Sequence, residues 1–235
     1  MLRQLDLYFR SGVEGAKREG AQQLNEHNTA SSFQRSFFMR PQTPQAIYQL
    51  KVTLMGSKPP IWRRVLVADT ITLGKLHTVM QVVMGWFDEH LHQFVLGREL
   101  YGVPDKEEKN FFFGMSVKDE NKAILSSLLW KEKDSMTYDY DFGDGWQHKV
   151  TLEKILPFDS AITLPCCIKG KGACPPEDCG GIWGYVDLVE VMSDKSNPDY
   201  EDRAEWLADH FGITDFNPEL FDLESVNSRL RRAYK

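Results

Sequence analysis

Two alternating runs of residues, joined by a glycine-containing turn, constrain the fold of this chain most strongly. Apolar and polar side chains alternate over residues 136–142 and again over residues 146–153, and the segment Gly143-Asp144-Gly145 lies between the runs. A period of two indicates strands with one buried face, and Asp-Gly between such strands is typical of a tight hairpin turn. The sequence therefore predicts an antiparallel hairpin over residues 136–153.

A second hairpin is predicted earlier in the chain. Residues 48–54 alternate in the same way, a loop containing two prolines follows, and residues 61–67 form the second run. The alternation places Arg63 and Arg64 on opposite faces, so one of them points toward apolar side chains and needs a polar partner there. A further alternating run, residues 90–96, predicts another strand.

Helical periodicity occurs once after the first hairpin and three times near the end of the chain. Thr72 is a suitable N-cap for the first helix, which ends near Gly85, and Asp199 and Asp222 are predicted to cap the last two helices. Residues 111–135 contain a segment that fits either a strand or a short helix. We expect an α+β fold: a mostly antiparallel sheet, one helix inserted after the first hairpin and a C-terminal helical segment.

The chain of 235 residues divides into two parts by composition. Residues 1–44 carry weak helical periodicity followed by a stretch rich in Gln, Asn, Ser and Thr, which is typical of a linker. Residues 45–235 hold the patterned segments. With 42% hydrophobic residues, the chain has enough apolar surface to bury a core. We therefore expect an N-terminal appendage and one α+β domain.

We infer the cellular compartment of the protein from three observations on the sequence. No apolar run approaches the roughly 18 residues of a membrane helix. The first 20 residues mix charges without the apolar segment of a secretory leader. Only four cysteines are present, too few for a disulfide scaffold. We therefore expect a cytoplasmic protein that has no membrane partner.

Charge is distributed unevenly along the chain. Residues 175–225 hold 14 acidic and 2 basic residues, a net charge of −12, which would repel a phosphate backbone. Net positive charge is found in residues 1–70, which hold 10 basic and 5 acidic residues, and in residues 226–235, which hold 4 basic residues and no acidic one. If nucleic acid binds, these two basic parts must make the contacts, whereas the acidic segment is interpreted as a set of solvated helical faces.

Several separated motifs occur in a recognisable order. They comprise the runs Tyr48–Val52, Pro59–Arg64, Leu76–His77, Met84–Trp86, His90–His92, Tyr138–His148, Cys174–Gly181, Gly184–Tyr185, Phe221–Glu224 and Val226–Arg232. Together these motifs resemble the plasmid pRiA4b ORF-three-like family over about residues 45–232.

The resemblance implies a fold and an association with plasmids or insertion elements, but it implies no reaction. Family members are often labelled as resolvase-like passenger proteins of such elements. A serine recombinase would open with a strand bearing an Arg and a nucleophilic Ser. The opening strand here, Tyr48–Val52, has neither residue. The resemblance therefore leaves function to be argued from individual side chains.

His90 and His92 are the first candidates for chemistry. Residues two apart on a strand leave the same face, roughly 6–7 Å apart at their roots. Such a pair can bind a metal or relay a proton, and His77 on the preceding helix lies near the edge of the apolar stripe. The alternative is a pair of hydrogen-bonded core histidines.

A second candidate set follows the hairpin of residues 136–153. Asp139 and Asp141 share one face of its first strand, and Asp141 and Asp144 lie near its turn. His148 shares a face with the apolar side chains of the second strand. Carboxylates in this arrangement can hold a divalent cation or act as acid and base. The alternative, which we favour at this stage, is that they pair with Arg63 or Arg64 across the sheet.

Three thiols form the third candidate. Cys167, Cys174 and Cys179 lie in a segment rich in Gly and Pro, predicted to be a loop over residues 166–181. With His148 they would complete a tetrahedral zinc site, although the close Cys-x2-Cys spacing that is typical of zinc binding is absent. Free reduced thiols and a disulfide are the alternatives.

Glu177 and Asp178 lie between two prolines and two glycines in the same segment. The pair fits either a ligand-binding turn, together with Arg63 and Arg64, or the start of a helix whose free N–H groups are met by carboxylates.

Three functional hypotheses follow. The chain contains no nucleophile–base motif, P-loop or dinucleotide fingerprint, so the first hypothesis is a non-enzymatic module that binds a protein partner. The second is a metal-dependent hydrolase or nuclease-like enzyme that uses His90, His92, Asp141, Asp144 and His148. The third is a DNA-binding accessory protein that uses Arg63, Arg64 and the basic tail.

Overall fold

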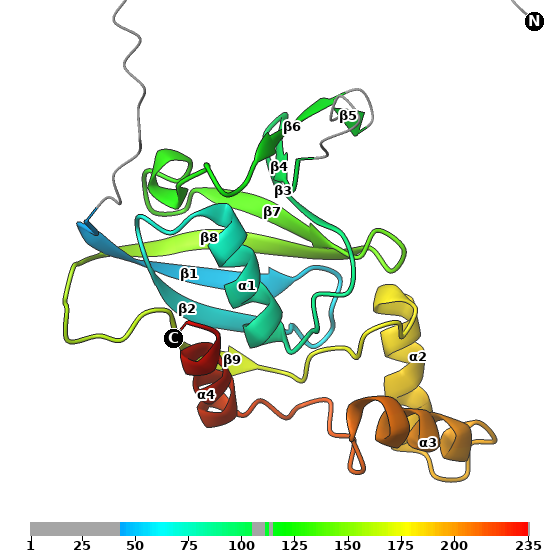
Figure 1. Cartoon of the computed structure of the whole chain (residues 1–235). Helices are drawn as coiled ribbons and strands as arrows, with labels where there is room; N and C mark the ends of the chain where they lie inside the picture. Colours follow the sequence, from blue (N-terminus) through cyan, green and yellow to red (C-terminus); the bar gives the residue numbers. More distant parts are fainter. Residues whose placement is uncertain (1–42, 105–110, 113–114, 235) are drawn as a thin grey trace, which may run out of the picture. The chain divides into compact units, whose positions relative to one another are not determined.

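A nine-stranded sheet organises the residues that the computed structural model describes, namely 43–104, 111–112 and 115–234 (Figure 1). The strand order is β5-β6-β4-β3-β7-β8-β1-β2-β9. Neighbouring strands are antiparallel except β4 and β6, which are parallel. The strands are β1 Ala46–Leu54, β2 Trp62–Ala68, β3 His92–Leu96, β4 Glu99–Gly102, β5 Phe111–Phe112, β6 Met115–Asp119, β7 Ser135–Tyr140, β8 Trp146–Pro157 and β9 Cys166–Lys171. The predicted α+β class with a mostly antiparallel sheet is confirmed.

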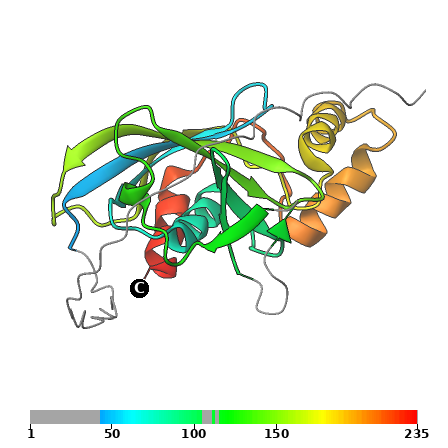
Figure 2. The ribbon, with the colours of Figure 1, turned by 90° about the horizontal axis from the view of Figure 1, so that it is seen from above.

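The helices are placed in two groups. Helix α1 (Leu73–Met84) follows the first hairpin, and α2 (Gly181–Ser193), α3 (Tyr200–Phe211) and α4 (Leu223–Ala233) close the chain. Helices α1 and α4 contact each other on one face of the sheet, whereas α2 and α3 pair beyond one of its ends (Figures 1 and 2). One helix after the first hairpin and a C-terminal helical segment are therefore both present.

The first hairpin and its helix form as their sequence patterns predict. In β1 the side chains of Leu50 and Val52 are fully buried, and the strand pairs with β2 in antiparallel register. The Thr72 hydroxyl accepts the backbone N–H of Lys75, which caps α1. Gly85 ends the helix at φ +99°, a conformation that glycine adopts without steric cost.

The second hairpin is confirmed, but its turn is longer than the tight Asp-Gly turn that the sequence predicts. The last pair of the ladder joins Tyr140 to Trp146, so residues 141–145 form the connection. The Asp141 N–H donates to the carbonyl of Leu91 instead of continuing the ladder, and the Gly145 N–H donates to the Asp141 carbonyl. The turn therefore opens because Asp141 is bonded to the neighbouring loop.

Two further expectations need correction. Residues 166–171, predicted as loop, form strand β9, because the outer edge of β2 offers unpaired backbone groups to it. Asp199 occupies the N-cap position of α3, yet its side chain makes no capping hydrogen bond. Asp222 does cap α4, since its Oδ1 accepts the Ser225 N–H at 2.9 Å. The ambiguous segment 111–135 contains β5, β6 and the 3-10 helix η1 (Leu125–Ser127).

Core packing fixes α1 against the sheet. Leu76 and Met80, on the apolar stripe of the helix, are fully buried, as are Tyr138 and Trp146 on the second hairpin. Burial of such side chains contributes roughly 1.5–3 kcal/mol each. The C-terminal end of α1 is thereby held near the β7–β8 turn, where polar side chains gather.

None of the helices in the described parts of the chain is both long enough and apolar enough to span a membrane.

Candidate functional site

Three connecting segments that are distant in sequence meet at one end of the sheet. They are residues 85–91 between α1 and β3, residues 141–145 between β7 and β8, and residues 172–180 before α2 (Figure 1). Backbone hydrogen bonds join them: the Phe87 N–H donates to the Glu177 carboxylate, and the Gly180 N–H donates to Asp144. Loops that meet in this way on a rigid sheet are the usual location of binding and catalytic residues.

His90 lies at the centre of this meeting point and faces three carboxylates. Its Nε2 atom lies 3.8 Å from Asp141 Oδ2, 3.8 Å from Glu177 Oε2 and 3.3 Å from Asp178 Oδ1. We call His90, Asp141, Glu177 and Asp178 the His90 cluster. The ligand-type atoms of His90, Asp141 and Asp178 all lie within 4.8 Å of one another, which is the spacing of groups that share one cation.

Two buried atoms of the His90 cluster lack a hydrogen-bond partner among the described residues. They are His90 Nε2 and Glu177 Oε2, which face each other. Buried polar atoms are nearly always hydrogen-bonded, because leaving one unpaired costs about 1–3 kcal/mol. An imidazole nitrogen and a carboxylate oxygen that face each other at 3.8 Å without a hydrogen bond leave room for a further ligand between them.

The carboxylates of Asp141 and Glu177 are oriented in the same manner. In Glu177, Oε1 accepts the Tyr140 hydroxyl and the Phe87 N–H, both at 2.9 Å, while Oε2 remains turned to His90. In Asp141, Oδ1 accepts the Gly143 N–H at 2.9 Å, while Oδ2 faces the imidazole. Burial raises the pKa of Glu177 above its usual value. One oxygen of each group is thus anchored and the other is presented to the cluster.

Backbone strain is concentrated at the same place. Asp88, Asp141 and Asp178 have φ angles of 62°, 53° and 56°, in the left-handed region that non-glycine residues rarely adopt. Two of these residues belong to the His90 cluster, and Asp88 lies two positions before His90. Strained backbone that persists in a folded chain is found most often at binding and catalytic sites.

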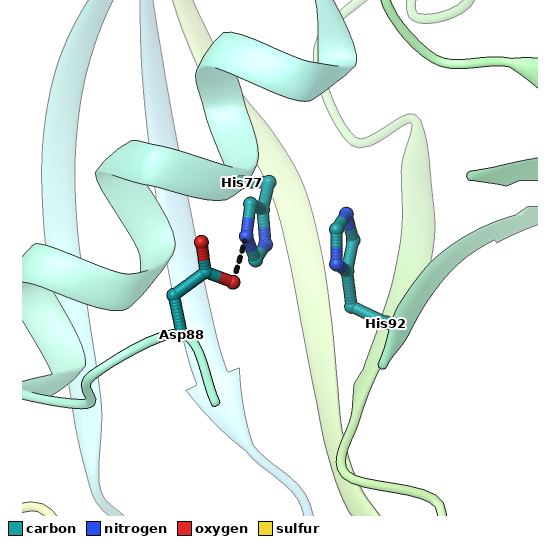
Figure 3. Close-up of side chains that lie close together, drawn as sticks. All are labelled: His77, Asp88 and His92. Carbon is teal, nitrogen blue, oxygen red and sulfur yellow. Dashed lines mark hydrogen bonds and ion pairs between the residues drawn. The ribbon is translucent and has the colours of Figure 1, made fainter. Parts of the chain in front are cut away.

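A second group of polar side chains adjoins the first (Figure 3). The rings of His77 and His92 are stacked, with centroids 3.5 Å apart and planes 4° from parallel. His77 Nε2 lies 2.8 Å from Asp88 Oδ1, and His92 Nε2 lies 2.9 Å from Glu120 Oε2. His77 lies on α1, His92 lies on β3 and Asp88 lies in the loop between them, whereas Glu120 directly follows β6. We call the two stacked histidines the His77 pair.

The His77 pair is less suited to hold a metal than the His90 cluster. Both ring nitrogens of His77 are occupied, since Nδ1 contacts the Tyr138 hydroxyl at 2.8 Å and Nε2 contacts Asp88. The ligand-type atoms of His77, Asp88 and His92 also lie within 4.8 Å of one another, but Nε2 of His92 is already bonded to Glu120. Burial and the neighbouring His92 lower the pKa of His77. We interpret this group as one that fixes the loop bearing Asp88 and His90.

The prediction that His90 and His92 lie on one strand is wrong, because β3 begins only at His92. The left-handed turn at Asp88 removes His90 from the alternating pattern. The two histidines therefore belong to different groups: His90 faces carboxylates near α2, and His92 stacks on His77 under α1.

The favoured pairing of arginines with the hairpin aspartates is also wrong. Arg63 is buried, as the alternation predicted, but it donates to the backbone carbonyls of Val83, Trp62 and Lys171. Arg64 instead pairs with Glu153 at 2.5 Å. The guanidinium of Arg63 is satisfied by carbonyls because the ends of α1, β2 and β9 meet beside it. Neither arginine lies in the His90 cluster.

Asp144 and His148 also lie outside the His90 cluster. Asp144 Oδ2 accepts the Gly180 N–H at 3.1 Å and so ties the β7–β8 turn to the start of α2. His148 is fully buried under Trp86, and its Nδ1 lies 3.3 Å from the Tyr138 carbonyl oxygen. Burial lowers the pKa of His148 to about 4, so the ring is neutral at pH 7.

The predicted zinc site is not assembled. Cys167, Cys174 and Cys179 are free thiols, and none of them belongs to a group of metal-ligand atoms in the described part of the chain. Cys167 lies on β9 and Cys179 precedes α2, so the strand separates the thiols that the loop prediction had placed together. Burial raises the pKa of Cys174 and raises that of Cys179 to about 12, which keeps both protonated.

The structure also positions residues that the sequence analysis did not single out. Asp88, Glu120 and Tyr140 support the two groups, and none of them stood out in the sequence. The short run Asp88-Glu89-His90 was the available signal, because three polar residues interrupt an apolar segment there.

Nucleic-acid binding by the basic regions stays a prediction. Residues 1–42, which include most of the basic N-terminal part, lie outside the described residues. Arg231 and Arg232 lie in the last turn of α4, where cations stabilise the helix dipole.

Comparisons with known proteins place the chain among relatives. The family model of the plasmid pRiA4b ORF-3-like protein matches residues 46–225. The chain belongs to this family. An uncharacterised protein of Sinorhizobium fredii (strain NBRC 101917 / NGR234) is 34% identical over 183 residues, 77% of this chain and 89% of that protein.

A solved relative supports the fold. The crystal structure of a protein of unknown function from Methanosarcina mazei Go1 matches with a TM-score of 0.68 and 38% identity, over 77% of this chain and 98% of that chain. The resemblance to the family that the sequence motifs indicated is confirmed. The relatives carry no assigned activity, so function depends on the geometry described above.

Proposed function

We propose that this protein is a divalent-cation-dependent hydrolase whose cation is bound by the His90 cluster. The observation that carries the proposal is that two buried atoms, His90 Nε2 and Glu177 Oε2, face each other beside two further carboxylates without forming a hydrogen bond. Bound to one octahedral cation at about 2.1 Å, neighbouring ligand atoms lie roughly 3 Å apart. The distances of 3.3–3.8 Å around His90 need little adjustment to reach that value.

The donor set favours a particular class of cation. Carboxylate oxygens suit Mg²⁺, Ca²⁺ and Mn²⁺, whereas imidazole suits Zn²⁺, Fe²⁺ and similar ions. Three carboxylates with one imidazole therefore favour Mn²⁺ as the probe. The excess of negative charge around a single histidine also attracts a cation in preference to an anion.

Access to solvent favours catalysis over a purely structural role. The side chain of Asp178 is 66% exposed and that of His90 is 28% exposed, so one side of the cluster is open to water. A catalytic metal site keeps such an open position, and the cation lowers the pKa of the water bound there. Water activated in this way needs no side-chain nucleophile, which agrees with the absence of a nucleophile–base motif in the sequence.

Calorimetric titration of Mn²⁺ into EDTA-treated, desalted protein tests the binding step. We expect one cation per chain, and Asp141→Asn should weaken binding at least tenfold. Asp139→Asn is the matched control, because Asp139 lies on strand β7 and its carboxylate accepts a hydrogen bond from Gln93 outside the cluster.

The hydrolysis reaction is tested by measuring the release of p-nitrophenol from a phosphate ester and from an acetate ester, with and without Mn²⁺. Absence of saturable Mn²⁺ binding would contradict the proposal.

A protein-binding role is a second candidate, favoured by one observation. Trp183 is 82% exposed in the first turn of α2, an unusual position for a large aromatic side chain in water. Association with plasmids or insertion elements and the cytoplasmic location stay predictions. Analytical ultracentrifugation of the wild-type chain and Trp183→Ala tests self-association, the simplest form of such a role.

A further inference from the structure

A cavity of about 160 Å³ lies beside α2, and no member of the His90 cluster lines it. It is enclosed by the β1–β2 loop, the end of β9 and one face of α2. Its walls are mainly apolar and include Pro59, Ile182, Val186 and Val189. A dry cavity of about 150 Å³ accommodates one benzene ring, so this cavity has room for a ring or a branched aliphatic group.

One part of the cavity wall is tightly packed, and another part is exposed. Gly172, at φ +79°, approaches Ile61 so closely that a Cβ atom would lie 2.9 Å from the isoleucine side chain. On the opposite wall, Val186 remains 45% exposed although it is a small apolar residue on a helix. Tyr185, which also lines the cavity, has a buried hydroxyl with no hydrogen-bond partner in the described residues. The α2 side of the cavity thus has uncovered apolar surface.

Charged side chains lie among the lining residues. Lys58 and Lys171 contribute two positive charges and Glu219 contributes one negative charge. None of the three forms an ion pair within the ranges that the structure describes. The lining residues therefore carry one net positive charge.

We propose that this cavity binds a small apolar carboxylate, with its ring or branched group against α2 and its carboxylate on Lys58 and Lys171. The inference is independent of the cation site, because it uses different residues and a different class of ligand. Apolar walls supply the favourable burial, and the two ammonium groups supply the preference for an anion.

Titration of benzoate, followed by amide shifts in two-dimensional NMR, tests the proposal. We expect benzoate to bind in the millimolar range with shifts at α2 and the β1–β2 loop. Benzyl alcohol, which has the ring without the charge, should bind at least tenfold more weakly. Acetate, which has the charge without the ring, should cause amide shifts that do not saturate.

Two variants complete the test. Val186→Phe fills the mouth of the cavity from a half-exposed position and should abolish benzoate binding. Lys58→Met with Lys171→Met should reduce benzoate affinity to that of benzyl alcohol, whereas Lys169→Met, on β9 outside the cavity, should not change it. Equal affinity for benzoate and benzyl alcohol, or unchanged benzoate binding in Val186→Phe and in the double lysine variant, would overturn the proposal.

Discussion

At the scale of single residues, the account depends most on Glu177, whose buried carboxylate keeps one oxygen without a partner. Glu177→Gln retains the size of the side chain and removes the charge. We expect Mn²⁺ affinity to fall at least tenfold while the metal-free protein keeps its unfolding midpoint, because an uncompensated buried charge is removed. Thermal unfolding with and without Mn²⁺ measures both effects.

Glu190→Gln, an exposed change on α2, is the control for this substitution and should keep the Mn²⁺-induced rise in unfolding temperature. A large loss of metal-free stability in Glu177→Gln would contradict the account, since it would mean that the carboxylate serves the fold and not a cation.

His148 predicts how stability depends on pH. Its folded pKa of about 4 is lower than the unfolded value of about 6.5, so the folded state resists protonation. The stability that the neutral His148 ring contributes is therefore present above pH 6.5 and is lost as the pH falls toward 4. The difference between the two pKa values corresponds to about 3 kcal/mol in the free energy of unfolding. Urea denaturation across this range should show a smaller loss for His148→Gln than for the wild type.

The exposed His210 provides the comparison for this pH effect, and His210→Gln should follow the wild-type curve. Identical pH dependence in His148→Gln and the wild type would show that the buried imidazole does not limit stability in acid.

Arg63 and Arg64 are neighbours in sequence with different expected sensitivities. Arg63→Lys loses the planar arrangement of donors that serves three carbonyl groups, and we expect a cost of about 3 kcal/mol. Arg64→Lys keeps a partly exposed ion pair with Glu153 and should cost less than about 1 kcal/mol. Chemical denaturation of the two variants compares them directly, and similar losses would be inconsistent with this description of Arg63.

At the scale of secondary-structure elements, the contact between the start of α2 and the β7–β8 turn determines the His90 cluster. Gly181 has φ +66°, and a Cβ atom there would lie 2.4 Å from the Asp144 carbonyl oxygen. Gly181→Ala should therefore destabilise the fold by about 3 kcal/mol and weaken Mn²⁺ binding, because Asp178 is displaced from Asp141.

Gly212 has the same φ angle at the end of α3 but open space around it. Gly212→Ala should cost only about 1 kcal/mol and leave Mn²⁺ binding unchanged. Denaturation and calorimetry on both variants separate backbone strain from steric overlap. An equal loss of stability in the two would contradict the close contact at Gly181.

Most helices and strands could be predicted from the spacing of apolar residues along the sequence. The His90 cluster could not, because it depends on contacts between segments that are distant in the sequence. Alternation predicted β1, β2, β7 and β8, and spacing predicted α1, because each of these elements buries one regular face. Strand β9 was missed since its pairing is set by the free edge of β2.

Individual side chains show the same limit of prediction from sequence. The spacing of His90 and His92 predicted that both lie on one strand, but the strand begins only at His92, after the left-handed backbone at Asp88. The sequence could show that Glu177 and Asp178 suit a ligand. It could not show that they face His90, because the three segments involved meet only in the tertiary structure.

At the scale of the whole molecule, one end of the sheet carries the features that matter for function. The described chain places three strained aspartates, a histidine with an unpaired nitrogen and an uncapped helix start together there. The ligand cavity lies on another face of α2, so a cation and a carboxylate are expected to bind without sharing a residue.

The most direct test of the central claim is the anomalous difference density of crystals soaked in Mn²⁺. The account predicts one strong peak at about 2.0–2.3 Å from His90 Nε2, with carboxylate oxygens of Asp141, Glu177 and Asp178 around it. A peak between His77 and His92, or no peak at the His90 cluster at saturating Mn²⁺, would contradict the account.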